Sequence, residues 1–232
     1  MAKETDLYAP VKAMLEGKGY VVKAEVTDCD VVAVKDDDPT VIVELKLAFS
    51  IDLVLQGIQR QNLTDDVYLG VQAPDTPTKR KNWRSRQRGY VKLCRMLGLG
   101  LILIDPDQAS KRQTKVLADP EPYTPRKNKR RQTRLMMEFM ARTGDPNTGG
   151  VTRTKIITAY RQDALRCAAA LEGRDSLKVA EIRDATGVAK AAAILQKNHY
   201  GWFERVDRGI YRLSPVGRDG LRYFAEAVKA MG

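Results

Sequence analysis

The sequence predicts an α/β fold, with a mixed sheet flanked by helices, followed by a smaller domain of helices and a β-hairpin. Three observations predict it. The first half places amphipathic segments between β-branched runs, in the order helix, three strands, helix, strand, helix, strand. Residues 119–150 are rich in Pro, Gly, Lys and Arg, which is typical of a linker. Residues 151–232 then show two helices, a short turn, a third helix and a hairpin.

The first helix is expected at residues 6–17, where apolar side chains recur at helical spacing. Pro10 is tolerated in its first turn, and Gly17 and Gly19 end it. The β-branched runs predict strands at residues 20–26, 30–34, 40–47, 67–71 and 100–104. Between these strands we expect helices at residues 50–63 and 86–97, and a polar, basic loop at residues 74–88.

The C-terminal segment follows a recognisable order of elements. We expect helices at residues 154–171, 179–185 and 188–198, and strands at residues 202–206 and 210–213. Ser176 is the expected cap of the second helix, Asp207-Arg208-Gly209 forms a hairpin turn, and Ser214-Pro215 opens a final helix. This order is that of a winged helix-turn-helix domain. The expected organisation is one domain over residues 1–120, a basic linker over 121–150, and a winged-helix domain over 151–232.

The distribution of charge indicates a polyanionic partner. The net charge is +11, but residues 1–75 hold 7 Lys and Arg against 14 Asp and Glu, and residues 76–120 hold 11 against 3. An acidic block followed by basic ones suits a protein whose carboxylates hold metal while other surfaces bind phosphates. A generic basic surface explains the charge alone equally well. The basic run at residues 126–131 is open to both interpretations, as a solvated linker or as a segment that contacts DNA.

The cysteine, histidine and apolar content excludes several classes of protein. Cys29, Cys94 and Cys167 are odd in number and too widely spaced for a disulfide framework or a zinc knuckle. His199 is the only histidine, which excludes a histidine-based metal cluster, and its place at a helix end favours capping or packing. The longest apolar runs, such as residues 99–104, are too short to span a bilayer. The N-terminal residues lack the apolar core of a signal peptide, so a reducing cytoplasm is the expected location.

Three charged residues at the ends of apolar strands carry the chemical signal. Glu44 and Lys46 end the run at residues 41–46, and the strand period of two puts both on one face. Asp30 opens the preceding strand, and a hairpin can bring it alongside. Two carboxylates and an ammonium at one sheet edge form a Mg²⁺ site, with hard oxygen ligands for the ion and the lysine beside the attacked phosphate. The alternative is a strand-end ion pair of Glu44 and Lys46, which leaves Asp30 unexplained.

The next helix carries two polar residues that need partners. Gln56 and Arg60 are four residues apart and so share one helix face, on nearly the same stripe as Leu53. Burying an amide or a guanidinium unpaired costs roughly 1–3 kcal/mol or more. We therefore expect both side chains to face the charged end of the strand at residues 40–47. In the alternative interpretation, Arg60 lies at the surface and Gln56 packs within the helix layer.

These residues resemble the active-site motif of the PD-(D/E)XK nuclease superfamily, with Asp30 as its Asp and Glu44-Leu45-Lys46 as its E-x-K. Residues 44–60, 67–69, 158–161 and 200–205 are also similar to an uncharacterised bacterial family of PD-(D/E)XK-type phosphodiesterases. The resemblance implies a restriction-endonuclease-like sheet, with one or two divalent ions bound by Asp30, Glu44 and the backbone carbonyl of Leu45. It further implies that Lys46 orients or deprotonates the attacking water, and that Gln56 positions a water or a phosphate.

Other residues carry weaker signals. Glu4 is the nearest candidate for a glutamate that some superfamily members carry in the first helix, and the superfamily's opening proline is absent near Asp30. Glu25 and Asp28 are either spare ligands or surface residues, and Trp83 either stacks on a base or anchors a basic loop. In the winged-helix domain, the expected phosphate contacts are made by Lys190, Lys197 and Arg208.

We therefore expect a nuclease that hydrolyses DNA phosphodiester bonds with Mg²⁺ or Mn²⁺ and is targeted by its winged-helix domain. The alternative is a non-catalytic DNA-binding regulator or scaffold with a structural nuclease-like domain. A third hypothesis is a winged helix that mediates protein dimerisation, and a homodimer is compatible with it. Intact Asp30, Glu44 and Lys46 favour the enzyme. On this hypothesis, replacing Asp30 or Glu44 by Ala removes a metal ligand and leaves the fold intact.

Overall fold

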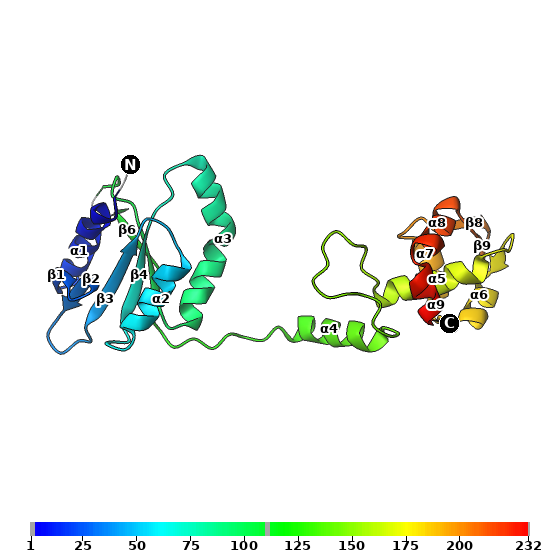
Figure 1. Cartoon of the computed structure of the whole chain (residues 1–232), viewed down its shortest axis with the longest axis horizontal. Coiled ribbons are helices and arrows are strands. Elements are labelled where there is room, and N and C mark those ends of the chain that lie inside the picture. The colour runs from blue at the N-terminus through cyan, green and yellow to red at the C-terminus, as the bar shows by residue number, and fades with distance from the viewer. Residues whose placement is uncertain (1–2, 110–111, 232) are drawn as a thin grey trace. The chain divides into compact units, whose positions relative to one another are not determined.

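A six-stranded mixed sheet forms the centre of the first of two compact units, residues 1–126 (Figure 1). The computed structural model describes residues 3–109 and 112–231. The strands lie across the sheet in chain order: β1 (Val21–Val26), β2 (Cys29–Val34), β3 (Val41–Lys46), β4 (Val67–Gln72), β5 (Gly100–Ile104) and β6 (Thr114–Ala118). β3, β4 and β5 are parallel, and the other pairs are antiparallel. The mixed sheet expected from the sequence is therefore present.

Helices cover both faces of this sheet (Figure 1). They are the 3₁₀ helix η1 (Glu4–Leu7), α1 (Tyr8–Glu16), α2 (Ile51–Arg60) and α3 (Pro77–Met96). η1 and α1 cover one face, where Leu7 and Val11 share a buried core with Val43 of β3. α2 and α3 cover the other face, where Leu53 and Cys94 share a second core with Ile42 and its neighbours. The mixed α/β layering predicted from the sequence is confirmed.

Helix α2 begins and packs in a way that brings its polar residues to the sheet. The Ser50 hydroxyl accepts a hydrogen bond from the backbone N–H of Leu53 at 3.2 Å and so caps the helix. Residue 57 has no side chain, and a Cβ placed there would lie only 2.6 Å from Cδ2 of Leu69. Because position 57 is glycine, α2 can lie close against β4. Gln56 and Arg60 are thereby held near the ends of the central strands.

The prediction of a loop at residues 74–88 is wrong, because α3 occupies most of this segment. Thr76 caps this helix by accepting a hydrogen bond from the backbone N–H of Lys79 at 3.3 Å, and Pro77 occupies the first position. The helix carries eight Lys and Arg residues and no Asp or Glu. Lys and Arg have good helix propensity, and an exposed helix needs no continuous apolar stripe. The absence of that stripe is why the periodicity does not predict it.

Strand β6 is also absent from the sequence prediction. It pairs only with β5 and so forms an edge of the sheet, and most of its residues are only partly buried or exposed. An edge strand of this kind lacks the continuous apolar run by which β5 is predicted.

The second unit, residues 127–232, has its own core and a three-stranded antiparallel sheet in the order β7-β9-β8. Its elements are α4 (Lys129–Ala141), α5 (Ala159–Leu171), β7 (Leu177–Lys178), α6 (Val179–Thr186), α7 (Ala191–Lys197), β8 (Phe203–Asp207), β9 (Ile210–Leu213), α8 (Pro215–Tyr223) and α9 (Ala225–Met231). The expected hairpin is present, with Gly209 at a φ of 73°. The cap of α8 is also as expected, because the Ser214 hydroxyl accepts a hydrogen bond from the backbone N–H of Gly217 at 2.9 Å. In the part of the chain that the structure describes, no helix has both the length and the apolar character needed to cross a membrane.

The start of α5 and the cap of α6 differ from the sequence prediction. α5 begins at Ala159 rather than near residue 154, because the Thr158 hydroxyl caps it by accepting from the backbone N–H of Arg161 at 3.2 Å. Ser176 is not the cap of α6. That position belongs to Lys178, whose backbone N–H donates to the Glu181 carboxylate at 2.7 Å.

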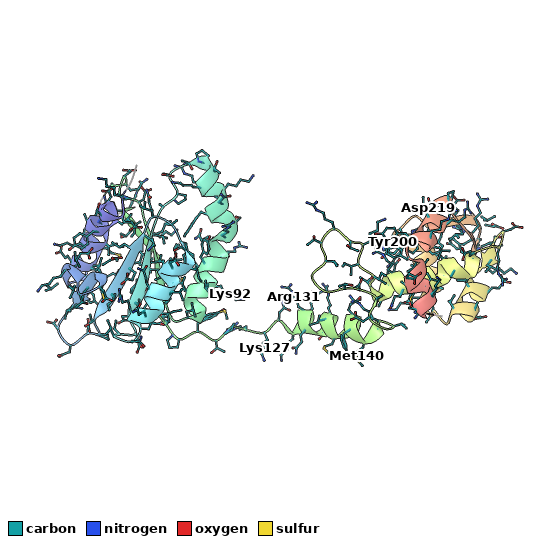
Figure 2. The ribbon with its side chains drawn as sticks, in the orientation of Figure 1. Lys92, Lys127, Arg131, Met140, Tyr200 and Asp219 are labelled. Carbon is teal, nitrogen blue, oxygen red and sulfur yellow. The ribbon has the colours of Figure 1, made fainter. Side chains whose placement is uncertain are left out.

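The stretch expected to be a linker contains helix α4. The Asn128 side chain caps α4 by accepting from the backbone N–H of Arg131 at 3.0 Å. Figure 2 labels Arg131 near the start of the helix and Met140 near its end, and both side chains are exposed. Glu138 ties α4 to α5, since its carboxylate accepts from the backbone N–H of Ala159 at 3.0 Å and from Nε of Arg142 at 2.9 Å. The charge run at the start of this stretch does not distinguish a helix from a linker, because Lys and Arg occur in both.

Candidate active site at the end of strand β3

The end of β3 presents two charged side chains to the α2 and α3 face of the sheet. In the parallel register, Glu44 lies beside Leu69 and Lys46 beside Val71. Leu69 and Val71 belong to the core under α2 and α3. Paired strand residues point to the same face, so Glu44 and Lys46 share that face, as the strand period predicts.

Asp30 is anchored to the backbone of the same strand. Its Oδ2 atom accepts a hydrogen bond from the backbone N–H of Leu45 at 2.7 Å. The backbone N–H and C=O of a strand residue point to the same side of the strand, so the Leu45 carbonyl also points towards β2. The hairpin of β2 and β3 therefore brings Asp30 to the Glu44-Leu45-Lys46 segment.

Glu44 is a buried carboxylate with a perturbed pKa. Its exposed fraction is 1 %. Burial raises its pKa above the usual value, and the charge of the neighbouring Asp30 raises it further. The hydrogen bond from Arg60 acts in the opposite direction. A buried carboxylate such as Glu44 needs a cation beside it to remain ionised.

Arg60 supplies part of the compensating charge. Its Nε donates to Oε1 of Glu44 at 2.6 Å, and its Nη1 donates to Oδ2 of Asp28 at 2.5 Å. Its Nη2 also donates to the backbone carbonyl of Asp28. Arg60 is buried, and the ion pairs raise its pKa above the usual range. The Asp28 carboxylate is 66 % exposed, and the hydrogen bond from Arg60 lowers its pKa. The alternative in which Arg60 is a surface residue is therefore wrong.

Lys46 is held from the other side by α2. Its Nζ donates to Oε1 of Gln56 at 3.3 Å. Gln56 and Arg60 thus contact Lys46 and Glu44 respectively, which is the face of α2 that their spacing predicts. The sequence prediction did not anticipate that Asp28 would be the second partner of Arg60.

A hollow of about 340 Å³ lies beside Asp30 and Leu45. Glu4 of η1 and Glu25 near the end of β1 also line it, so three carboxylate residues border one cavity. Glu25 has a φ of 50°, in the left-handed region, and lies in the irregular part of the β1–β2 hairpin. That irregularity is a feature of the backbone, and the side-chain pattern of the sequence carries no signal for it.

The donor set fits a hard divalent cation. Across residues 3–109 and 112–231, no three Asp, Glu, His or Cys side chains lie close enough to form a metal site by themselves. Mg²⁺ is usually bound by one or two carboxylates, with waters and substrate phosphates completing its shell. Asp30, Glu44 and the Leu45 carbonyl provide two carboxylates and one backbone oxygen at the same strand end. These residues therefore have the donor chemistry of an open site for a hard divalent cation.

A family model places this chain among known sequences. Residues 102–220 match the family described as "Putative PD-(D/E)XK phosphodiesterase (DUF2161)". The chain belongs to this family. The match runs from β5 to α8, so the PD-(D/E)XK family assignment rests on residues that follow Asp30, Glu44, Lys46 and Gln56. The six-stranded mixed sheet flanked by helices fits the PD-(D/E)XK fold. Neither a curated protein nor a solved structure matches the chain.

For a PD-(D/E)XK family member, the burial of Glu44 changes one expectation from the sequence. Glu44→Ala was expected to remove a ligand and leave the fold intact. The structure contradicts this, because Glu44 is the buried partner of a buried arginine. Removing Glu44 would leave the exposed Asp28 as the carboxylate partner of the buried Arg60, and breaking a buried pair of this kind costs about 3–5 kcal/mol. A substitution that tests chemistry must therefore retain the hydrogen bond to Arg60.

The other predicted site residues lie outside this cluster. His199 packs against Tyr160, with ring centroids 5.6 Å apart, which agrees with the packing role. Trp83 lies on α3 and packs with Tyr90 against the core between the sheet and helices α2 and α3 in the first unit. Lys190 directly precedes α7, Lys197 is its last residue, and Arg208 lies in the turn between β8 and β9, all in the second unit.

Proposed function

We propose that this chain is a divalent-metal-dependent nuclease that hydrolyses phosphodiester bonds of DNA. The observation that carries the proposal is that Asp30, which accepts a hydrogen bond from the Leu45 N–H, lies with the buried Glu44 and with Lys46 at the end of β3. Membership of a PD-(D/E)XK phosphodiesterase family supports it. A DNA-binding regulator with a retired nuclease-like unit would have no physical need to keep these charges together.

Each residue has a distinct part in the proposed mechanism. Asp30, Glu44 and the Leu45 carbonyl would hold Mg²⁺ or Mn²⁺, which when bound stabilises negative charge on the attacked phosphate. The Leu45 N–H orients Asp30, and Arg60 orients Glu44 by bonding Oε1, so that Oε2 would be the oxygen that binds the ion. Lys46 orients or deprotonates the attacking water and offsets charge that develops on the phosphate.

The proposal is tested by incubating the full chain with supercoiled, linear and single-stranded DNA in Mg²⁺ or Mn²⁺. We expect cleavage of at least one form that stops when a chelator is added and returns when Mg²⁺ is restored. Cleavage that persists in chelator would contradict the metal site. DNA binding without cleavage in either ion would favour the non-catalytic regulator.

Gln56→Ala is expected to lower the cleavage rate by about 10- to 100-fold, the equivalent of the ~1.5–3 kcal/mol of a hydrogen bond to a charged group. The physical reason is that Gln56 holds the Lys46 ammonium through Oε1 at 3.3 Å. Because Gln56 is only partly buried, its loss should change thermal stability and DNA affinity much less. Gln59→Ala, an exposed amide on the same helix, is the matched control and should retain wild-type turnover. Equal turnover of Gln56→Ala and wild type would assign Gln56 a packing role.

We further propose that the second unit is a winged-helix domain that binds DNA. The order α5-β7-α6-α7-β8-β9 and the sheet β7-β9-β8 support this proposal, with α7 as the recognition helix and the β8–β9 hairpin as the wing. Lys190, Lys197 and Arg208 are exposed, and none forms an ion pair within the described residues. Unpaired cations on these elements are suited to contact phosphates.

The full chain should bind duplex DNA in chelator with an affinity that falls steeply with salt. Each phosphate contact contributes about 0.9 to the slope of log affinity against log salt. Replacing Lys190, Lys197 or Arg208 by Ala should therefore reduce the slope by about one each. Lys12→Ala, a surface cation of α1 that pairs with Glu16, should leave it unchanged. Unchanged slopes in all three variants would make the second unit a protein-interaction module.

A further inference from the structure

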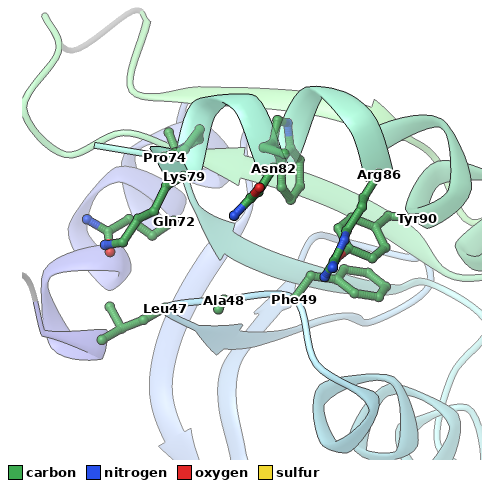
Figure 3. A pocket seen from close by; sticks show the side chains of 11 residues that line it. Leu47, Ala48, Phe49, Gln72, Pro74, Lys79, Asn82, Arg86 and Tyr90 are labelled. Carbon is green, nitrogen blue, oxygen red and sulfur yellow. The ribbon is translucent and has the colours of Figure 1, made fainter. Parts of the chain in front are cut away.

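A cavity of about 230 Å³ opens beside the candidate active site and has no part in the proposed mechanism (Figure 3). Its walls come from residues 47–49, which follow β3, from residues 72–74, which follow β4, and from one face of α3. Leu47 lines the cavity and is the next residue after Lys46. Neighbouring Cα atoms are about 3.8 Å apart. If a phosphodiester of a DNA strand lies at Lys46, the adjacent nucleotide of that DNA strand would therefore lie at this cavity.

Three aromatic side chains form one wall. Phe49 and Tyr90 are stacked, with ring centroids 4.1 Å apart and an interplanar angle of 18°. The ring centroids of Trp83 and Tyr90 are 5.6 Å apart, with an interplanar angle of 48°. All three rings are only partly buried, so they leave surface open towards the cavity. Aromatic rings of this kind stack on nucleobases regardless of base identity.

Polar side chains of α3 form the opposite rim. Lys79, Asn82 and Arg86 are exposed and line the cavity. Figure 3 shows Asn82 and Arg86 pointing from α3 towards the loop that carries Ala48 and Phe49. An asparagine amide carries both donors and an acceptor and so can pair with the edge of a base, and the planar guanidinium of an arginine can stack on the face of a base.

We propose that this cavity binds one unpaired nucleobase of the DNA strand that is cleaved, so that the substrate is single-stranded or locally unpaired DNA. This inference rests on the proposed nuclease function. The volume lies below the ~300–1,000 Å³ of pockets for drug-sized molecules, and so suits a single ring system. A base within a duplex is stacked on both faces and must leave the stack before it can enter. In the alternative, the three aromatic residues only anchor α3 to the sheet.

The test measures binding of the full chain in chelator, so that cleavage does not interfere. The probes are a fluorescent single-stranded oligothymidylate and an abasic strand of the same length, which has the same phosphates but no bases. Wild type should prefer oligothymidylate by about 5- to 150-fold, the equivalent of the ~1–3 kcal/mol of one stacked base. Trp83→Ala should abolish most of the preference, and Trp83→Phe should retain it. Circular dichroism checks that both variants are folded.

Two cations on α3 distinguish binding of a base in the cavity from general electrostatic attraction of the DNA. Arg86 lines the cavity, whereas Arg88 is exposed and does not line it. Arg86→Ala should weaken the oligothymidylate complex more than the abasic one, and Arg88→Ala should weaken both equally. The same effect of both variants on both probes would overturn the proposal.

Four further outcomes decide between the proposals. Equal binding of the two probes by wild type would overturn the proposal, and so would binding of thymidine monophosphate as tight as that of the oligonucleotide. A base preference that depends on Trp83, in a protein that cleaves no DNA in Mg²⁺ or Mn²⁺, would support the cavity and refute the nuclease function. Cleavage of duplex and single-stranded DNA at equal rates, without base preference, would refute the cavity alone.

Discussion

Glu44→Gln should lower metal-dependent cleavage of DNA by on the order of 10³-fold while leaving the fold intact. A bound divalent ion contributes several kcal/mol to such a reaction, and each ~1.4 kcal/mol corresponds to tenfold in rate. A neutral amide binds the ion more weakly than a carboxylate does. The amide oxygen can still accept the hydrogen bond from Nε of Arg60, which Glu44 now accepts at 2.6 Å. The loss should therefore be in catalysis, with little loss of stability.

The measurement is the initial cleavage rate across a range of Mg²⁺ and Mn²⁺ concentrations, alongside thermal unfolding in chelator. Asp28→Asn is the matched control, because Asp28 is the other carboxylate paired with Arg60 but is 66 % exposed. It should cleave within a few-fold of wild type. Wild-type turnover in Glu44→Gln would refute the assignment of the site, and equal losses in both variants would show that the effect passes through Arg60.

The central site could be predicted because its signal lies in the period of a strand. Glu44 and Lys46 are charged residues at alternate positions of an apolar run, and only one face can accommodate both. The partner residues Gln56 and Arg60 follow from the same logic on a helix, where a spacing of four places two side chains together. In each case the sequence places polar residues where an apolar stripe is otherwise required.

The helices that could not be predicted lack an apolar stripe. α3 and α4 are exposed and basic, and their caps, Thr76 and Asn128, are single residues of a type that is also common in loops. The role of Asp28 depends on a tight turn in which Thr27 has a φ of 58°. Nothing in the side-chain pattern specifies that backbone geometry, which brings Asp28 to a residue 32 positions away. Because α3 lacks an apolar stripe, the sequence places the basic rim of the proposed nucleobase cavity in a loop.

Arg60→Met should destabilise the protein by about 3–5 kcal/mol, because it leaves the Glu44 carboxylate buried without its counter-ion. The exposed Asp28 carboxylate is hydrated when it loses the same partner, so Glu44 accounts for most of the cost. Urea unfolding in chelator measures the change. Lys12→Met, which removes an exposed cation paired with Glu16, is the control and should change stability by no more than about 0.5 kcal/mol.

A double variant separates the structural role of this pair from its chemical role. Replacing a buried ion pair by apolar side chains of similar volume is often neutral or stabilising. Glu44→Leu combined with Arg60→Met should therefore recover most of the stability that Arg60→Met alone loses. It should not recover cleavage, because the carboxylate that would hold the metal ion is gone. If the double variant is as unstable as the single one, the Glu44–Arg60 contact is not the source of the cost. If it regains cleavage, Glu44 is not a metal ligand.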